Sequence, residues 1–382
     1  MRSKSPAQFP VQSDGENQIV ILEVVRGFGR GGAERALVNR LSRAPENVTT
    51  YIFNSAGMLD GLANAPHSHA RVERPFNLIR QIRAFTKLVK RVQPTVVVAR
   101  TPYDLIIVRL SRVFKTSDYL LIYEAHSEFI TQKKGFIRIS GTVFDWSMKC
   151  VNEVFAVSRA VTKGHLCRAS HSVSVVPLGC KVNPNPRLMT LTHTGPTLVY
   201  LGRFDPLKRV PWIIDRVNEL RSELRELDAR VYVVGDGPER SAILAAVEKY
   251  RLDDLVTVRQ WMEFPEELLA TADILVVASK SEGMPLVAVE AKRLGLRIVS
   301  TPLAGVMEIC DEDDFVNPSW EPKHYSEALL AAVSLWKVDD QRRQSKWKST
   351  EHLDERVCAA NYYRHIFGLV QDQFNDGASG DV

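Results

Sequence analysis

Cysteine is scarce in this sequence of 382 residues, which contains Cys150, Cys167, Cys180, Cys310 and Cys358. The five are scattered, odd in number and include no Cys-x-x-Cys pair. This spacing argues against a disulfide framework and against a structural zinc site. We expect the thiols to be buried or inert.

Long apolar runs are also missing. No apolar stretch reaches the roughly 18 to 20 residues that a helix needs to cross a bilayer. Residues 1–18 are polar, carry Pro, Ser and Gly, and lack the apolar core of a secretory signal. We therefore expect a flexible leader over residues 1–18 and a protein that stays in the cytoplasm.

Several signatures of enzyme chemistry are absent. The sequence has no His-Glu-x-x-His motif and no Cys/His cluster, so we expect no metal. It has no Gly-x-x-x-x-Gly-Lys-Ser/Thr motif, which argues against a P-loop ATPase. It also lacks Gly-x-Ser-x-Gly, which argues against a serine hydrolase.

Acidic residues are few in the first part of the chain. Through residue 190 there are 27 Lys and Arg against 13 Asp and Glu, a net charge of +14. The remainder has 23 against 32, a net charge of −9, and the whole chain carries +5. The basic part indicates an anionic partner: nucleic acid, anionic lipid or a pyrophosphate-linked substrate. Because no helix-turn-helix, RRM or OB-fold pattern is present, we expect no nucleic-acid partner.

Apolar strands alternate with amphipathic helices almost from end to end, which is typical of parallel sheets covered by helices on both faces. Ile19–Val25 reads as a buried strand, and Leu78–Val92 as a helix with Asn77 as its N-cap. The alternation stops between Pro177 and Pro196, a stretch with four prolines, and resumes at residue 197. The expected fold class is therefore α/β, with two doubly wound, Rossmann-like domains.

The expected domain boundaries follow from this alternation. They are a leader over 1–18, an N-terminal domain over 19–180, a linker over 181–196, a C-terminal domain over 197–350, a C-terminal helix over 351–372 that crosses back to the first domain, and a flexible tail over 373–382. Ligands of such sheets bind at the carboxyl ends of the strands.

Glycine-rich and basic loops follow several of these strands. Gly31 and Gly32 stand between a strand and a helix, where an anion can meet free backbone N–H groups, although a structural turn explains them equally well. Arg203 and Lys208 follow the strand that opens the second domain and could clamp a diphosphate, or form a solvated surface pair. Gly235 stands in a Gly-Asp-Gly turn.

The most informative stretch runs from residue 281 to 291. Glu282 stands in its loop, and Gly283 to Leu286 lead into a helix N-terminus that could bind an anion. Glu290 follows among apolar neighbours, where an unpaired carboxylate would be costly; ligand hydroxyls or a salt bridge would satisfy it. His126 follows another strand and could face a ligand, or serve as a structural hydrogen-bonding group.

Taken together, these motifs resemble the retaining GT-B glycosyltransferases of the GT4 type, over about residues 19 to 369. The matching segments, in the family's order, are Gly31 to Arg35, Val157-Ser158, Val176 to Gly179, Gly202-Arg203 with Lys208, Gly235 to Pro238, the Glu282/Glu290 pair of the Glu-x7-Glu motif, and Gly305 with Glu308. Gln260 and Arg209 depart from the pattern, since family members often have Gly there.

The resemblance implies a role for each matching residue. His126 and Glu282 would be the catalytic residues, with His126 beside the anomeric centre. The donor would be bound by Gly31, Gly32, Arg203, Lys208, Gly235, Gly283, Met284, Pro285, Leu286 and Glu290. Arg203 and Lys208 would hold the diphosphate, and Glu290 the ribose hydroxyls. No metal or other cofactor would be needed.

The resemblance also implies a reaction. A hexose-type sugar would pass from a nucleotide-sugar, most often a UDP-sugar, to a glycan or polyprenyl-diphosphate-linked acceptor held by the basic N-terminal domain. The setting would be the synthesis of cell-surface polysaccharide or glycoconjugate. The stretch Lys133 to Trp146 mixes cations with bulky apolar side chains, which would suit peripheral contact with the inner face of the membrane or a solvated basic segment. The alternatives are a sugar-nucleotide epimerase of the same fold and a non-catalytic protein that only binds a nucleotide-sugar.

Overall fold

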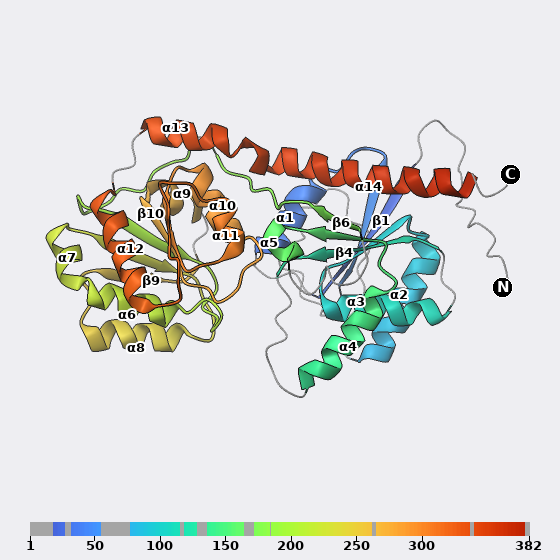
Figure 1. The fold of residues 1–382 in the computed structure, drawn as a ribbon, viewed down its shortest axis with the longest axis horizontal. Helices are drawn as coiled ribbons and strands as arrows, with labels where there is room; N and C mark the ends of the chain where they lie inside the picture. The colour runs from blue at the N-terminus through green and yellow to red at the C-terminus, as the bar shows by residue number, and fades with distance from the viewer. Residues whose placement is uncertain are drawn as a thin grey trace. The chain divides into compact units, whose positions relative to one another are not determined.

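The computed structural model describes residues 18–26, 32–54, 77–114, 118–127, 136–163, 172–183, 185–261, 265–336 and 340–378. The chain divides into two compact units. The first unit combines Met1–Gly179 with Glu355–Val382, and the second is Cys180–Asp354. Each unit is a parallel sheet with helices on its faces (Figure 1), which confirms the expected α/β class of two doubly wound domains.

The first unit is built on a six-stranded parallel sheet in the order β2-β1-β3-β4-β5-β6. Its strands are β1 Ile19–Val25, β2 Val48–Asn54, β3 Val96–Ala99, β4 Leu120–Ala125, β5 Glu153–Ala156 and β6 Ser172–Val175. Its helices are α1 Gly32–Leu41, α2 Leu78–Val92, α3 Pro102–Ser111, the short η1 Arg112–Phe114, α4 Phe136–Met148, α5 Arg159–Thr162 and α14 Glu355–Ala378. The strand order reverses between β1 and β3, which is where such sheets bind ligands.

Local sequence sets the ends of these helices. The Asn77 side chain accepts a hydrogen bond from the Arg80 N–H at 2.9 Å, so the expected N-cap of α2 is confirmed. Thr101 and Asp104 form a capping box at the start of α3, where Pro102 needs no N–H partner.

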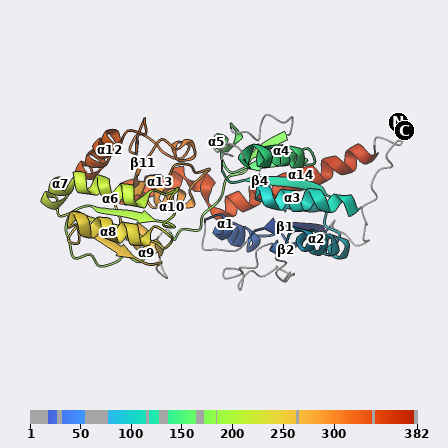
Figure 2. The ribbon, with the colours of Figure 1, turned by 90° about the horizontal axis from the view of Figure 1, so that it is seen from below.

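Helix α14 returns the chain to the first unit. It packs with α1 on one face of the sheet, while α2 and α3 lie on the other (Figure 1; Figure 2). Tyr362, Tyr363 and Ile366 of α14 are buried against Ile19 and Ile21 of β1. Each such buried side chain contributes roughly 1.5–3 kcal/mol. The helix continues to Ala378, past the expected end at residue 372, and includes Gly377.

The second unit repeats the architecture with the order β12-β11-β10-β7-β8-β9. Its strands are β7 Thr197–Leu201, β8 Arg230–Val234, β9 Val256–Arg259, β10 Ile274–Val277, β11 Arg297–Ser300 and β12 Phe315–Val316. Its helices are α6 Val210–Glu219, α7 Arg221–Glu226, α8 Arg240–Tyr250, α9 Pro265–Thr271, α10 Leu286–Arg293, α11 Ala304–Met307, α12 Pro322–Ser334, α13 Asp340–Ser349 and η3 Glu351–Leu353. Side chains of α6, α8 and α12 cover one face and those of α9, α10 and α11 the other.

The stretch 181–196, expected as a linker, lies within the bounds of the second unit. The preceding Cys180 N–H donates to the Leu353 carbonyl at 3.1 Å. Further along, the Met189 N–H donates to Thr271 Oγ1 at 2.8 Å, and the His193 ring bonds Thr197 Oγ1 at 2.8 Å. These contacts attach the stretch to the second unit at both of its ends.

The structure also bears on two expectations from the sequence, one about the cysteine thiols and one about membrane-spanning helices. Cys150, Cys180, Cys310 and Cys358 form no disulfide and are at least partly buried, as expected; Cys167 lies outside the described residues. Burial raises the pKa of the Cys150 thiol, which keeps it protonated and unreactive. Within the described part of the chain, no helix is both long and apolar enough to span a bilayer.

Candidate functional site

The loops after β7 and β10 bring two of the predicted site residues together. These strands are neighbours in the sheet, so their carboxyl ends meet at one edge. Lys208 Nζ and Glu282 Oε1 form an ion pair, and Ser279 Oγ donates to the same carboxylate oxygen at 2.9 Å. The side chains are 27% and 16% exposed, so the pair is held at the surface of the second unit rather than sealed inside it.

Arg203 lies in the same loop as Lys208 but is more open. Its side chain is 65% exposed and reaches within 3.5 Å of Asp205. Its backbone is fixed, because the Tyr200 hydroxyl donates to the Arg203 carbonyl at 2.8 Å. A solvent-exposed guanidinium on a hydrogen-bonded backbone suits capture of an anion that arrives from solvent.

Glycine is required in the turn after β8 by a close backbone approach. Gly235 has φ +155°, and a Cβ there would lie 1.8 Å from the Gly202 carbonyl oxygen. Gly237 is similarly placed, 2.5 Å from the Phe204 carbonyl oxygen. The structure therefore gives Gly235 a packing role that holds the loops after β7 and β8 together; its predicted contact with a donor stays a prediction.

The loop before α10 is pressed against α11. A Cβ on Gly305 would lie 1.7 Å from the Gly283 carbonyl oxygen, so only glycine fits there. Gly283, Met284, Pro285 and Leu286 are all buried. Pro285 is the N-cap of α10 and provides no side-chain hydrogen bond. The first N–H groups of α10 thus lack a side-chain cap, as in a helix N-terminus that binds anions.

Glu290 lies one turn inside α10 and is 4% exposed. Its neighbours Val289 and Ala291 are buried too, so the carboxylate lies inside the second unit. Burial of a carboxylate requires compensating hydrogen bonds or charges.

The remaining predicted residues belong to the first unit. Gly32 is the first residue of α1, and Gly31 lies outside the described residues. His126 follows β4, is 19% exposed, and places its Nε2 3.1 Å from Glu124 Oε1. The stretch from Lys133 to Trp146 is only partly described; Trp146 is 40% exposed, and the Arg109 guanidinium lies 4.8 Å above its ring.

Sequence reasoning missed a buried charge cluster behind His126. Glu23 of β1 and Glu124 of β4 are each bonded to both Arg40 and Arg100, with N–O distances of 3.0–3.1 Å. The available signal was a glutamate inside each of two otherwise apolar strands. A charge in such a position needs a partner.

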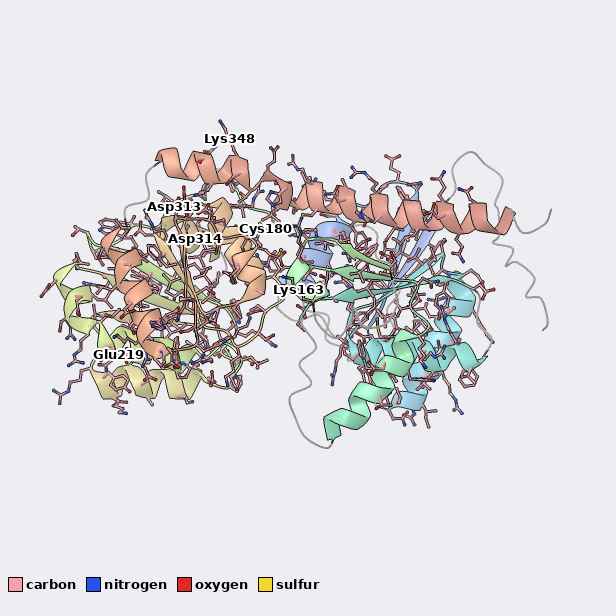
Figure 3. The ribbon with its side chains drawn as sticks, viewed as in Figure 1. Lys163, Cys180, Glu219, Asp313, Asp314 and Lys348 are labelled. Carbon is pink, nitrogen blue, oxygen red and sulfur yellow. The ribbon has the colours of Figure 1, made fainter. Side chains whose placement is uncertain are left out.

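One acidic motif of the second unit has a structural explanation. Asp311 and Asp313 form an Asp-x-Asp sequence that could attract a cation. Both carboxylates pair with Lys346 of α13, and Asp311 pairs with Lys292 as well. Figure 3 shows Asp313 and Asp314 on the side of the unit covered by α13, whose Lys348 points outward. Among the described residues, no cluster of His, Cys, Asp and Glu is arranged to hold a metal ion.

Comparison with known proteins identifies the class. Residues 195–334 match the family described as glycosyl transferases group 1. N-acetyl-alpha-D-glucosaminyl L-malate synthase of Bacillus anthracis is 32% identical over 192 residues, which are 50% of this chain and 49% of the relative. The phosphatidylinositol N-acetylglucosaminyltransferase gpi3 subunit of Schizosaccharomyces pombe is 26% identical over 264 residues, 63% of this chain and 56% of the relative. The matches therefore span about half the length of these relatives.

Solved structures agree on the fold. HepE of Anabaena, in complex with UDP, superposes with a TM-score of 0.75 at 14% identity, covering 92% of this chain and 100% of HepE. The lipopolysaccharide outer core galactosyltransferase WaaB superposes with a TM-score of 0.69, also at 14% identity, covering 92% and 99%. The solved structures thus show a GT-B fold, and residues 195–334 match the glycosyl transferases group 1 family. More narrowly, the predicted resemblance to the group 1, GT4-type family is confirmed, with residues 195–334 as its family domain.

Proposed function

We propose that the protein is a retaining glycosyltransferase that moves a hexose-type sugar from a UDP-sugar to a glycan or polyprenyl-diphosphate-linked acceptor. The observation that carries the proposal is the site of the second unit: the Lys208–Glu282 pair beside the uncapped start of α10. HepE, which shares the fold, binds UDP and UDP-glucose, and two relatives are named for N-acetylglucosaminyl products or donors.

The residues of the second unit suit departure of a nucleoside diphosphate. When the bond between the anomeric carbon and the diphosphate oxygen breaks, negative charge grows on the leaving oxygen. Lys208, Arg203 and the backbone N–H groups of Gly283, Met284 and Leu286 would stabilise that charge, as preorganised donors do in other transfer reactions. The buried carboxylate of Glu290 would accept hydrogen bonds from the ribose hydroxyls. This chemistry needs no metal ion or other cofactor.

Glu282 would act at the sugar. In the absence of a donor its carboxylate neutralises Lys208 and accepts from Ser279. A donor diphosphate would take over Lys208, because a dianion attracts an ammonium more strongly than one carboxylate does. The freed carboxylate would then be available to the hydroxyls of the transferred sugar.

The basic first unit would receive the acceptor. The net charge of +14 through residue 190 favours a lipid-linked diphosphate and an anionic membrane surface. The proposed setting is the cytoplasmic face of the cell membrane, during synthesis of a cell-surface polysaccharide or glycoconjugate.

The first experiment is a thermal-shift panel of UDP, GDP, ADP and their common sugar conjugates, without added metal. A ligand that binds only the folded protein raises its melting temperature. We expect UDP and at least one UDP-sugar to raise it. A UDP-sugar that is then converted to UDP and a glycosylated acceptor supports the transferase; one that returns as an epimer, or binds without turnover, contradicts it.

A further inference from the structure

The buried charge cluster of the first unit consists of Glu23, Arg40, Arg100 and Glu124. Each of the four side chains is at most 9% exposed. Two carboxylates face two guanidiniums, so the formal charge of the cluster is zero. A charge-balanced arrangement of this kind is rigid, because moving any member leaves a buried charge without its partner.

Helix α14 completes the cluster. The Tyr362 hydroxyl donates to Glu23 Oε1 at 3.2 Å, and the Arg40 guanidinium lies 3.6 Å above the Tyr362 ring. The Tyr363 hydroxyl donates to the Arg40 carbonyl at 3.2 Å. Burial raises the pKa of Glu124, but Arg100 and Arg40 outweigh burial and hold that pKa well below its usual range. Glu124 therefore stays ionised at neutral pH.

The two oxygens of Glu124 have different tasks. Arg40 and Arg100 both donate to Oε2, each at 3.0 Å. The other oxygen, Oε1, is 3.1 Å from His126 Nε2, close but not well aligned for a hydrogen bond. Contacts of this kind often tighten once a ligand is bound. Because an ionised carboxylate only accepts, the nitrogen that faces it must carry the hydrogen.

In the neutral ring, the other nitrogen of His126 is then an acceptor. Its Nδ1 is buried and has no hydrogen-bond partner among the described residues. A buried, unpaired acceptor beside the carboxyl end of a sheet strand requires an explanation, and a ligand hydroxyl is one.

We propose that Glu124, held by Arg40 and Arg100, is a positioning residue that fixes His126 as the Nε2–H tautomer, so that Nδ1 accepts a hydroxyl of the substrate. The inference rests on the proposed function for the identity of that substrate, a sugar. It does not rest on it for the tautomer, which is a property of the unliganded protein.

The tautomer can be measured directly in the wild-type protein. Long-range ¹⁵N–¹H spectra of histidine-labelled protein at about pH 8.5 distinguish a protonated Nε2 from a protonated Nδ1, and a His126→Gln spectrum assigns the signal. We expect hydrogen on Nε2. Hydrogen on Nδ1 would overturn the proposal, whether or not any variant folds.

A Glu124→Gln variant tests the same point, because it should reverse the tautomer of His126. The two arginines would retain the amide oxygen at the place of Oε2, so the NH2 group would face His126 Nε2. We expect the tautomer to change to Nδ1–H and the turnover number to fall about 100-fold, the effect typical of a misplaced catalytic group, while KM for the donor changes little. A folded variant with an unchanged tautomer or unchanged turnover would contradict the proposal.

Glu153→Gln is the matched control. Glu153 is a buried glutamate of the neighbouring strand β5, 2% exposed, which accepts from Ser174 Oγ at 2.7 Å. It should leave the His126 signal and the turnover number unaltered. If the wild-type protein shows no transfer at all, the proposed function fails, while the tautomer still decides the present inference.

Discussion

The two units use charged side chains in opposite ways. In the first, Glu23, Arg40, Arg100 and Glu124 are buried and form ion pairs with one another. In the second, Lys208 and Glu282 are paired but partly open to solvent, and Arg203 is mostly exposed. A buried, charge-balanced cluster is closed to solvent, so it fixes geometry. An open pair can exchange its partner for a ligand, so it suits binding.

The largest effect should come from opening the closed cluster. Arg100→Met leaves two buried carboxylates with one guanidinium, and we expect the first unit to lose about 3–5 kcal/mol of stability. Hydrogen exchange at β1 and β4 would measure it, since a two-unit protein need not unfold in one step. Arg225→Met, which removes an exposed pair with Asp254, should have no measurable effect in the second unit. Equal losses of stability in Arg100→Met and Arg225→Met would contradict the distinction between buried and exposed charges.

The open pair should matter for binding rather than for folding. Lys208→Ala is expected to lower donor turnover about 100-fold, the usual effect of losing one stabilising donor, with hydrogen exchange in the second unit unchanged. Lys323→Ala, at an exposed lysine of the same unit paired with Glu327, is the control. A folded Lys208→Ala protein with full turnover would exclude Lys208 from the site.

The backbone packing beside Lys208 and Glu282 should tolerate an added methyl group less well than that of α14. Gly305→Ala places a methyl group 1.7 Å from the Gly283 carbonyl oxygen, so we expect a loss of about 1–3 kcal/mol and weaker donor binding. Gly368→Ala, in α14 with nothing within 4 Å of the new atom, should stabilise the protein by up to about 1 kcal/mol. Thermal unfolding with and without UDP measures both; a neutral Gly305→Ala would contradict the close approach.

The smallest expected effect is the loss of stability at low pH. The lowered pKa of Glu124 means that its stabilising contribution is complete above its ordinary value of about 4.5 and is lost as the pH falls through the lowered value. Burial raises the pKa of Asp311, but Lys346 and Lys292 lower it overall. The contribution of Asp311 to the stability of the second unit is therefore also lost as the pH falls. Hydrogen exchange measured between pH 6 and 3 should show that the stability of the first unit depends less on pH in Glu124→Gln than in the wild-type protein. An unchanged pH dependence would mean that Glu124 is not held ionised.

The sequence was sufficient for features set by near neighbours. Apolar runs located β1 at its observed bounds, and Asn77 predicted the start of α2. The order of glycine and charge motifs predicted the fold class and the family. The closed cluster was not predicted, because its members come from β1, α1, β4 and the end of β3, and partners as far apart as 84 residues meet only once the sheet is formed. Gly235 shows the converse: a motif suggested a ligand, while the structure gives it a backbone neighbour. The roles of the donor-site residues stay predictions.

Helix α14 has a consequence for how the chain is made. The first unit needs Tyr362 and its neighbours, yet residues 180–354 intervene and form a contiguous unit of their own. On the ribosome, where domains fold as they emerge, the second unit can therefore reach its native state before the first, although it is synthesised later. The unit that is begun first is finished last, and until α14 emerges the nascent chain carries Glu23 and Arg40 without their tyrosine cover.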